Sequence, residues 1–211
     1  MNKNAVLCVI PARYGSHRLP GKPLAEINGL PLVMWVYNRA LESDAFDQVF
    51  VATDDERIRT AVEYHGGSAV MTGSGHASGT DRVHEVALAT TSTHVVNLQG
   101  DEPTIPPQLL RDFASSLDRL DGNSLLTCVG NATINEMLDP NVVKAVLANN
   151  GDALYFSRAP IPYARGGVRG WGYRHTGLYG FTQESLARFC ELPRGILEQT
   201  ERLEQLRALE G

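Results

Sequence analysis

Short apolar runs of β-strand type alternate with stretches of helical pattern through the first half of the chain. The strand-type runs lie at residues 5–10, 48–52, 68–71 and 94–98. The helical patterns lie between them, at residues 32–41, 55–64 and 81–89. This order is typical of parallel strands joined by crossover helices. The sequence therefore predicts an α/β fold, with a mainly parallel sheet flanked by helices.

The second half has a less regular pattern. Further strand candidates, separated by connections that contain glycine and proline, lie at residues 124–129, 142–147, 153–156 and 177–181. Residues 161–172 are rich in Arg, Gly and Pro and precede Tyr173, which is typical of an exposed loop or a strand-like arm. We expect a mixed sheet that carries this segment as an inserted extension.

The end of the sequence predicts an amphipathic helix at residues 197–209. Leucines lie near helical spacing at Leu197, Leu203, Leu206 and Leu209. Glu198 precedes Arg202 by four residues, the spacing at which opposite charges pair on a helix. We expect one continuous helix with this ion pair on its surface.

Composition bounds the number of domains and the class of partner. With 211 residues, 43% of them hydrophobic, the chain can bury a substantial core, and we expect a single domain over residues 1–211. The net charge of −5 argues against binding to nucleic acid, which needs a broad face of clustered Lys and Arg. Any basic site must therefore be local.

The cysteines and the N-terminal residues bear on the cellular compartment. Cys8, Cys128 and Cys190 are widely spaced and form neither a metal-ligand pattern nor a Cys-x-x-Cys pair, which is typical of buried free thiols in a reducing compartment. The apolar run at residues 5–10 is too short to span a membrane and lacks a signal-peptide cleavage region. We expect a cytoplasmic protein without membrane insertion.

A basic loop follows the first predicted strand, at residues 11–24. Three of its side chains are cationic and two of its residues are glycines: Arg13, Arg18, Lys22, Gly15 and Gly21. In α/β sheets, ligands tend to bind outside the carboxyl ends of the strands, where this loop must lie. The cations can surround a polyphosphate, and the glycines let backbone N–H groups approach its oxygens. The spacing matches neither a Walker A loop nor the dinucleotide-binding motif.

Short motifs extend this pattern over nearly the whole chain. They are IPARYGS at residues 10–16, RLPGKPL at 18–24, VATDD at 51–55, SGTDR at 78–82, NLQGDEP at 97–103, ALYFSR at 153–158 and LEQLR at 203–207. In this order they closely resemble the motifs of the 3-deoxy-manno-octulosonate (Kdo) cytidylyltransferases. The resemblance implies a Rossmann-like fold of the nucleotide-diphospho-sugar transferase type. It also implies transfer of CMP from CTP to Kdo, the sugar-activation step of lipopolysaccharide synthesis.

The same resemblance places several residues beside the nucleotide. Besides the loop cations these are Ser16, Gly79, Thr80, Arg82 and Gln99. Asp81 is better explained as a helix cap, because Ser, Thr and Asp at a helix start accept hydrogen bonds from the first backbone N–H groups. Asp54 and Asp55 are equally well explained by capping of the helix that follows them.

Asp101 is the candidate metal ligand. It follows the strand-type run at residues 94–98, which places a carboxylate at a strand end near the basic loop. Mg²⁺ prefers oxygen ligands and usually binds through one or two carboxylates plus substrate phosphates. A turn-forming Asp before Glu102 and Pro103 is the competing explanation, and the family resemblance favours the metal. We assign no role to Glu102.

An acidic sugar needs a cationic partner for its carboxylate and hydrogen-bonding groups for its hydroxyls. Arg158 is the leading candidate for the carboxylate. By resemblance, four further residues match the family's sugar-contact positions: His175, Tyr179, Glu204 and Gln205. In the family Gln99 lies near both substrates. We do not assign His175 as a general base.

The implied reaction is attack of the sugar's anomeric oxygen on the α-phosphorus of CTP. The predicted catalytic set is Arg13, Arg18, Lys22 and Asp101. The three cations would stabilise the departing pyrophosphate, and Asp101 would hold the Mg²⁺ that polarises the α-phosphate and lowers the pKa of the attacking hydroxyl. No protein nucleophile is required.

Two alternatives stay open. A synthetase for another acidic sugar, 8-amino-Kdo or a sialic acid, would have the same type of site. An inactive nucleotide- or sugar-binding remnant is the other, because the sequence ends at Gly211, whereas the family usually continues into an Asp-Thr-Pro-Glu-Asp-like motif whose first aspartate also helps bind metal. The family commonly forms homodimers, and we expect the interface at residues 161–179.

Overall fold

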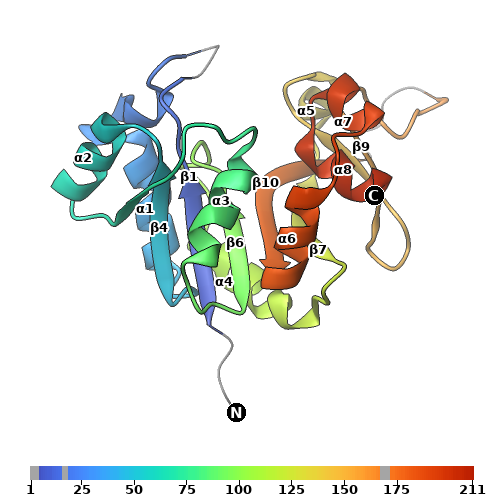
Figure 1. Cartoon of the computed structure of the whole chain (residues 1–211). Coiled ribbons are helices and arrows are strands. Elements are labelled where there is room, and N and C mark those ends of the chain that lie inside the picture. Colours follow the sequence, from blue (N-terminus) through green and yellow to red (C-terminus); the bar gives the residue numbers. More distant parts are fainter. Residues whose placement is uncertain (1–4, 16–18, 167–171) are drawn as a thin grey trace. The chain divides into compact units, whose positions relative to one another are not determined.

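The structure is a computed structural model that describes residues 5–15, 19–166 and 172–211 (Figure 1). The chain divides into two compact units. The first consists of Met1–Leu126 and Leu178–Cys190, and the second of Thr127–Gly177 and Glu191–Gly211. The single nucleotidyltransferase domain expected over residues 1–211 stays a prediction.

The first unit is built on a mainly parallel sheet. Its four parallel strands are, in order across the sheet, β5 (Ala69–Met71), β4 (Gln48–Thr53), β1 (Val6–Pro11) and β6 (His94–Leu98). β10 (Tyr173–Thr182) pairs antiparallel with β6 through residues 178–182. Residues 7–10 of β1 are fully buried, because a central parallel strand is covered on both faces. The predicted Rossmann-like α/β fold with a mixed, mainly parallel sheet is confirmed.

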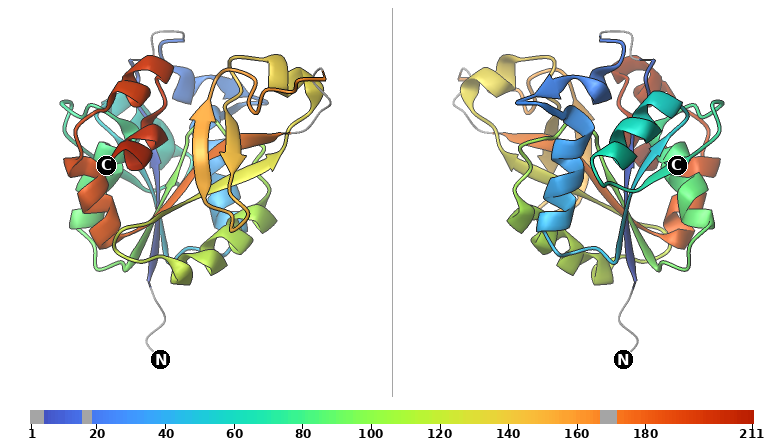
Figure 2. Two further views of the ribbon diagram at one scale, coloured as in Figure 1. Left: turned by 90° about the vertical axis from the view of Figure 1, so that its right-hand side faces the viewer. Right: turned by 90° about the vertical axis from the view of Figure 1, so that its left-hand side faces the viewer.

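Helices cover both faces of this sheet. α1 (Leu32–Glu42) and α4 (Pro107–Ser116) lie on one face, and α3 (Gly79–Leu88) and α6 (Gln183–Glu191) lie on the other (Figure 2). α2 (Glu56–Tyr64) packs beside β4 and β5. Every strand and helix that the sequence predicts for the first half of the chain is present.

Short elements occupy the connections of the first unit. The 3-10 helix η1 (Lys22–Leu24) and the hairpin of β2 (Glu26–Ile27) and β3 (Leu30–Pro31) lie between β1 and α1. The 3-10 helix η2 (Leu117–Arg119) follows α4. Among the residues described, none of the helices combines the length and the apolar character that a bilayer span requires.

The second unit contains antiparallel strands and short helices. β8 (Lys144–Leu147) pairs with β9 (Ala153–Ser157) and with the first residues of β10, and β7 (Leu125–Asn131) also pairs with β10. The helices are α5 (Ile134–Leu138), α7 (Ile196–Glu201), η3 (Glu204–Leu206) and α8 (Arg207–Glu210). Within the predicted extension, residues 161–166 form neither helix nor strand, and residues 167–171 lie outside the described part.

The cysteines follow the prediction in part. Cys8 is fully buried in β1, as expected, and burial raises the pKa of its thiol. Cys128 and Cys190 are only half-buried. A thiol as inaccessible as that of Cys8 packs as a small apolar side chain rather than as a reactive group.

The continuous helix predicted at residues 197–209 is wrong. α7 ends at Glu201, the next residue Arg202 has a φ of 54° in the left-handed region, and the chain then turns into η3 and α8. Glu198 does not pair with Arg202. Its two carboxylate oxygens instead accept hydrogen bonds of 2.8 Å each from Nε and Nη2 of Arg207, and both residues are buried.

This turn changes which face of the C-terminal segment is apolar. It brings Leu203 and Leu206 against Ala145 and Phe156 in the core of the second unit. A straight helix would keep the four predicted leucines in one stripe, but the break lets the chain fold back around a buried ion pair. Short-range spacing carried no information about that pair, because Glu198 and Arg207 are nine residues apart.

Replacing Glu198 by Ala tests the pair. The change leaves the guanidinium of Arg207 buried without its anion, and we expect the free energy of unfolding in urea to fall by about 3 kcal/mol. Gln199→Ala, on the exposed side of the same helix, is the matched control and should change it by less than about 0.5 kcal/mol. Equal stability of the two variants would show that the ion pair does not hold the C-terminal segment.

Candidate functional site

The basic loop begins directly at the carboxyl end of β1. Ala12 is buried and donates its N–H to Ala52 O at 2.8 Å, which continues the pairing of β1 with β4, and Arg13 is exposed. The loop closes where Gly21 N donates to Tyr14 O at 2.8 Å. Gly21 has a φ of +71°, a conformation that favours glycine. Ser16 and Arg18 lie outside the described residues.

Lys22 and Asp101 lie together at this edge of the sheet. Lys22 Nζ is 2.7 Å from Asp101 Oδ2, and the two side chains are 39% and 52% exposed. The turn after β6 packs closely on β1, because a Cβ on Gly100 would lie 3.3 Å from Pro11 O. The predicted placement of Asp101 beside the basic loop is confirmed. An ion pair this exposed adds little to stability, so both charges are available to a ligand.

The acidic groups near the loop fit one kind of metal site. Within the described residues no group of three or more His, Cys, Asp or Glu side chains could hold a metal ion. Asp101 therefore belongs to no cluster of three or more such side chains in the part of the chain that the structure describes. One carboxylate suits Mg²⁺, which takes its other ligands from phosphates and water, and does not suit a metal held entirely by protein side chains.

A chain of polar side chains connects Gln99 to α3. Gln99 Nε2 donates to Asn97 Oδ1 at 3.3 Å, and Asn97 Nδ2 donates to Thr80 Oγ1 at 3.0 Å. Asn97 is fully buried in β6, and Tyr179 lies opposite it in the pairing with β10. The sequence analysis missed Asn97. The signal that could have found it is a single amide side chain within the strand-type run at residues 94–98.

The start of α3 lies against the end of β1. Ser78 is its N-cap and forms a capping box with Asp81, so the prediction that Asp81 is a cap is confirmed. A Cβ on Gly79 would lie 3.3 Å from Pro11 Cγ. The absence of a side chain at Gly79 therefore lets the N-terminus of α3, where the helix dipole is positive, come close to the basic loop.

Arg82 is buried and has partners within the protein. Its Nη2 lies 3.2 Å from Asp54 Oδ2, and its Nη1 donates to Thr72 Oγ1. Asp55 caps α2 by accepting from Arg57 N at 3.0 Å, as predicted. The capping explanation thus holds for Asp55, whereas Asp54 pairs with Arg82. The nucleotide contact of Arg82 stays a prediction.

Arg158, in the second unit, is held by main-chain carbonyls. Its Nε donates to Glu201 O at 2.9 Å, its Nη1 to Pro140 O at 3.1 Å and its Nη2 to Arg202 O at 3.5 Å. Five N–H groups are available on a guanidinium. Only the N–H groups that are not used in these bonds remain for a sugar carboxylate. Arg158 therefore also has a structural role, because it connects three main-chain carbonyl groups.

Lys144, which the sequence analysis did not select, fixes the same region. It is fully buried, and its Nζ donates to Asp139 O at 2.8 Å, to Val142 O at 2.7 Å and to Arg158 O. Burial lowers the pKa of Lys144. Three carbonyls match the three donors of an ammonium group, so this charge supports the backbone around Arg158.

His175 lies in a largely apolar setting of the second unit. Its Nε2 is 2.8 Å from Thr127 Oγ1, and the ring of Phe156 lies edge-on with the centroids 5.0 Å apart. Burial lowers the pKa of His175 to about 4. The imidazole is therefore neutral at physiological pH, where it can donate or accept a hydrogen bond but supplies no charge.

The last two predicted sugar contacts lie in η3. Gln205 is buried and Glu204 is half-buried. Both therefore lie on the inner side of the turn that replaces the predicted helix. Their contact with a sugar stays a prediction.

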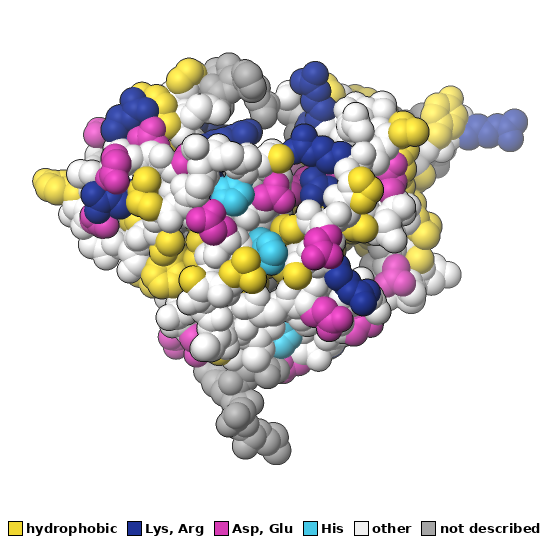
Figure 3. Space-filling model, in the orientation of Figure 1, with side chains coloured by type: hydrophobic (Ala, Val, Ile, Leu, Met, Phe, Trp, Pro, Cys, Tyr) yellow, Lys and Arg dark blue, Asp and Glu magenta, His cyan; other side chains and the backbone are white. Residues whose placement is uncertain are grey.

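Charges of both signs are interspersed on the face shown in Figure 3. Lys and Arg side chains lie among Asp, Glu and His there. This distribution agrees with the net charge of −5 and with a basic site that is local.

Comparison with known proteins identifies the family. A family model described as cytidylyltransferase matches residues 7–211. A 3-deoxy-manno-octulosonate cytidylyltransferase of Myxococcus xanthus is 49% identical over 215 residues, which cover 100% of this chain and 86% of the relative. An 8-amino-3,8-dideoxy-manno-octulosonate cytidylyltransferase of Shewanella pealeana is 47% identical over 211 residues, 97% of this chain and 86% of the relative.

A solved structure agrees with these sequence relatives. It is that of a CMP:2-keto-3-deoxy-manno-octonic acid synthetase complexed with CTP, with a TM-score of 0.90 and 42% identity, and the match covers 98% of this chain and 86% of that one. With a matching family model over both units and relatives this similar, the chain belongs to the cytidylyltransferase family that includes the 3-deoxy-manno-octulosonate cytidylyltransferases.

Proposed function

We propose that this protein transfers CMP from CTP to Kdo and releases pyrophosphate. The observation that carries the proposal is the pairing of Lys22 with Asp101 at 2.7 Å beside the basic loop. It puts a cation for phosphate and a carboxylate for metal at one edge of the sheet. The solved structure at 42% identity is complexed with CTP, and relatives at up to 49% identity are named for Kdo.

The residues of the first unit suggest how CTP is held. Arg13 and Lys22 would bind the phosphates that leave as pyrophosphate, and the N-terminus of α3 adds a positive potential near them. Binding of the triphosphate would draw Lys22 towards phosphate and leave Asp101 to hold Mg²⁺ with its exposed carboxylate. Bound Mg²⁺ would supply charge neutralisation at the α-phosphate.

The sugar side draws on neutral as well as charged groups. Because His175 is neutral, it would serve as a hydrogen-bonding partner for a hydroxyl and not as a counter-ion for the sugar carboxylate. The carboxylate would bind the remaining N–H groups of Arg158. Tyr179, next to the polar chain through Asn97, would contact the sugar on the side of Gln99.

The competing sugar is 8-amino-Kdo. Relatives named for this sugar are 47% and 48% identical to the chain, close to the identity of those named for Kdo. The two sugars differ at a single carbon, where one has a hydroxyl and the other an amine. Discrimination would therefore depend on whether the site offers a carboxylate or a neutral acceptor to that position.

We also propose that the protein is a cytoplasmic homodimer. Tyr163 is 88% exposed and Tyr173 is 40% exposed, and both lie in the segment at residues 161–179 where we expect the interface. Exposed aromatic side chains of this kind are enriched where protein surfaces meet. The dimer proposal predicts that the side chains of Tyr163 and Tyr173 become buried between two copies of the chain.

Pyrophosphate release tests the activity. With CTP and Mg²⁺ we expect turnover with Kdo, and a kcat/KM at least about tenfold lower with 8-amino-Kdo or a sialic acid. CTP without sugar is the control. Turnover with 8-amino-Kdo alone would move the assignment to that sugar, and the absence of turnover with all three would refute it.

Asp101→Asn tests the metal side. Asparagine keeps the shape of the side chain but removes its charge, so we expect kcat to fall by at least about 100-fold with the fold intact. Asp112→Asn is a matched control, because Asp112 is an exposed carboxylate of α4 whose oxygen accepts from Gln108 at 2.8 Å. Full activity of Asp101→Asn would remove Asp101 from the site.

The pKa of His175 predicts how stability depends on pH. The pKa is lowered from about 6.5 in the unfolded chain to about 4, so the unfolded state binds more protons between these values. Stability is therefore complete above about pH 6.5 and falls by about 3 kcal/mol as the pH drops towards 4.

Unfolding in urea at several pH values measures this. The advantage of the wild type over His175→Gln should shrink as the pH falls through that window, and the imidazole resonance should stay unchanged down to about pH 5. An imidazole that titrates near 6.5 would contradict the prediction.

A further inference from the structure

Arg57 contacts the basic loop from a different part of the fold. Its Cζ lies 3.4 Å from the ring centroid of Tyr14. Tyr14 belongs to the loop after β1, whereas Arg57 is the second residue of α2, which follows β4. A guanidinium plane stacks well on an aromatic face, and at this distance the two groups are in contact.

The guanidinium of Arg57 is fixed by Asp55. Arg57 Nε donates to Asp55 Oδ1 at 2.9 Å and Nη2 donates to Oδ2 at 2.6 Å, while Oδ1 also accepts from the backbone N of Arg57. The helix cap and the ion pair thus share one carboxylate. This bidentate pair with Asp55 fixes the orientation of the guanidinium that stacks on Tyr14.

The ring of Tyr14 in turn lies against Gly21. A Cβ on Gly21 would lie 3.0 Å from Cε2 of that ring, so a glycine is needed for this approach. The main chain makes a second link, because Gly21 N donates to Tyr14 O at 2.8 Å. Gly21 immediately precedes Lys22, and Tyr14 immediately follows Arg13. The contact between Tyr14 and Gly21 therefore lies directly beside both described cations of the loop, Arg13 and Lys22.

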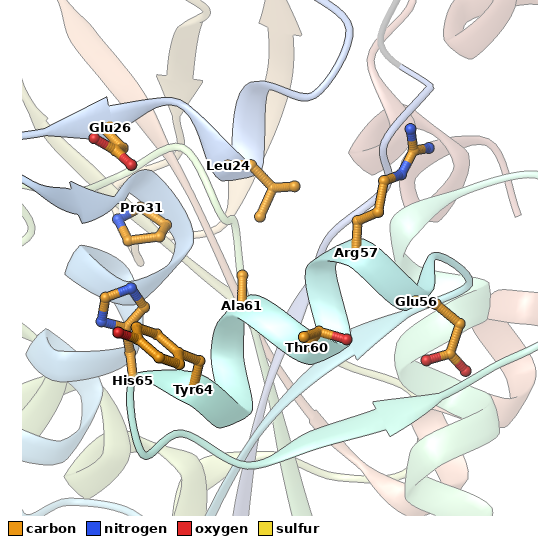
Figure 4. Close-up of a pocket in the computed structure, with 9 residues that line it drawn as sticks. All are labelled: Leu24, Glu26, Pro31, Glu56, Arg57, Thr60, Ala61, Tyr64 and His65. Carbon is orange, nitrogen blue, oxygen red and sulfur yellow. The ribbon is translucent and has the colours of Figure 1, made fainter.

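α2 and the loop base also line a common hollow. A hollow of about 590 Å³ lies between η1, the β2–β3 hairpin and α2, and is lined by Leu24, Pro31, Ala61, Tyr64 and His65 among others. Figure 4 shows the side chain of Arg57 extending away from Tyr64 and His65. α2 also contacts η1 directly, and the stacking of Arg57 on Tyr14 links α2 to the part of the loop that precedes η1.

We propose that Arg57 is a positioning residue for the triphosphate site, acting through Tyr14 on the loop that carries Arg13 and Lys22. The proposal rests on the proposed function, because it assumes that these cations bind CTP. In this proposal Arg57 acts through Tyr14 and contacts neither substrate itself. Its two hydrogen bonds to Asp55 make it a fixed support rather than a mobile phosphate ligand.

Hydrogen exchange tests the support without reference to activity. In Arg57→Gln we expect the amides of Gly21 and Lys22 to exchange about fivefold faster than in the wild type, since the loop base opens more often. Arg59→Gln is the matched control. Arg59 lies on the same helix, and its ion pairs among the described residues are within that helix, with Glu56 at 2.7 Å and Glu63 at 2.8 Å. Equal exchange in the two variants would overturn the proposal.

Steady-state kinetics tests whether the contact of Arg57 with the loop affects CTP binding. We expect Arg57→Gln to raise KM for CTP about fivefold with less than a twofold change in kcat, and Arg59→Gln to leave both unchanged. Arg57→Lys should behave like Arg57→Gln, because lysine keeps the charge but loses the planar fork. Recovery by lysine would instead show a long-range charge effect and overturn the positioning role.

A double substitution tests whether Arg57 acts through Tyr14. Adding Arg57→Gln to Tyr14→Leu should cause little further change in KM, because Arg57 acts through that ring. Additive effects would contradict the proposed route. If the wild type turns over none of the sugars with CTP, the proposed function fails, whereas the exchange measurement still decides whether Arg57 supports the loop.

Discussion

Parallel pairing of β1 with both β4 and β6 is the constraint on which the candidate site depends. It forces the ends of three strands to one edge of the sheet, so the loop after β1 and the turn after β6 emerge side by side. Gly79 and Gly100 then allow α3 and that turn to pack within contact distance of Pro11. The proximity of Lys22 and Asp101 is a consequence of this arrangement, although the two residues are 79 positions apart.

Several cations near the candidate site are held by groups of the protein itself. Lys144 donates three hydrogen bonds to main-chain carbonyl oxygens, which matches the three N–H groups of its ammonium. Arg158 uses three of its five N–H groups in the same way. Arg82 is likewise held between Asp54 and Thr72. Buried cations must be paired or fully hydrogen-bonded because an unsatisfied charge in the interior is costly. A cation in a family motif can therefore have a structural role whether or not it also meets a ligand.

The division between charged and neutral groups has a chemical consequence. Among the residues predicted to hold the nucleotide and its metal, Arg13 and the pair of Lys22 and Asp101 are exposed, which suits recognition of a highly charged triphosphate. Among the predicted sugar contacts, His175 is neutral and Gln205 is buried, which suits hydroxyl groups that need oriented hydrogen bonds, whereas Arg158 offers a cation to the carboxylate.

The sequence by itself determined the α/β class, the strands and helices of the first half, the caps at Asp55 and Asp81 and the neighbourhood of the basic loop and Asp101. These features depend on local periodicity, on helix-start chemistry and on the rule that ligands gather at the carboxyl ends of parallel strands.

Only the tertiary structure decided the break in the C-terminal segment, since the buried partner of Glu198 is Arg207 and not the predicted Arg202. It also decided the partners of Arg82 and Arg158 and the stacking of Arg57 on Tyr14. Contacts of this kind join segments that are distant in the chain, so residue spacing carries no record of them; burial and geometry in the folded protein select the partner.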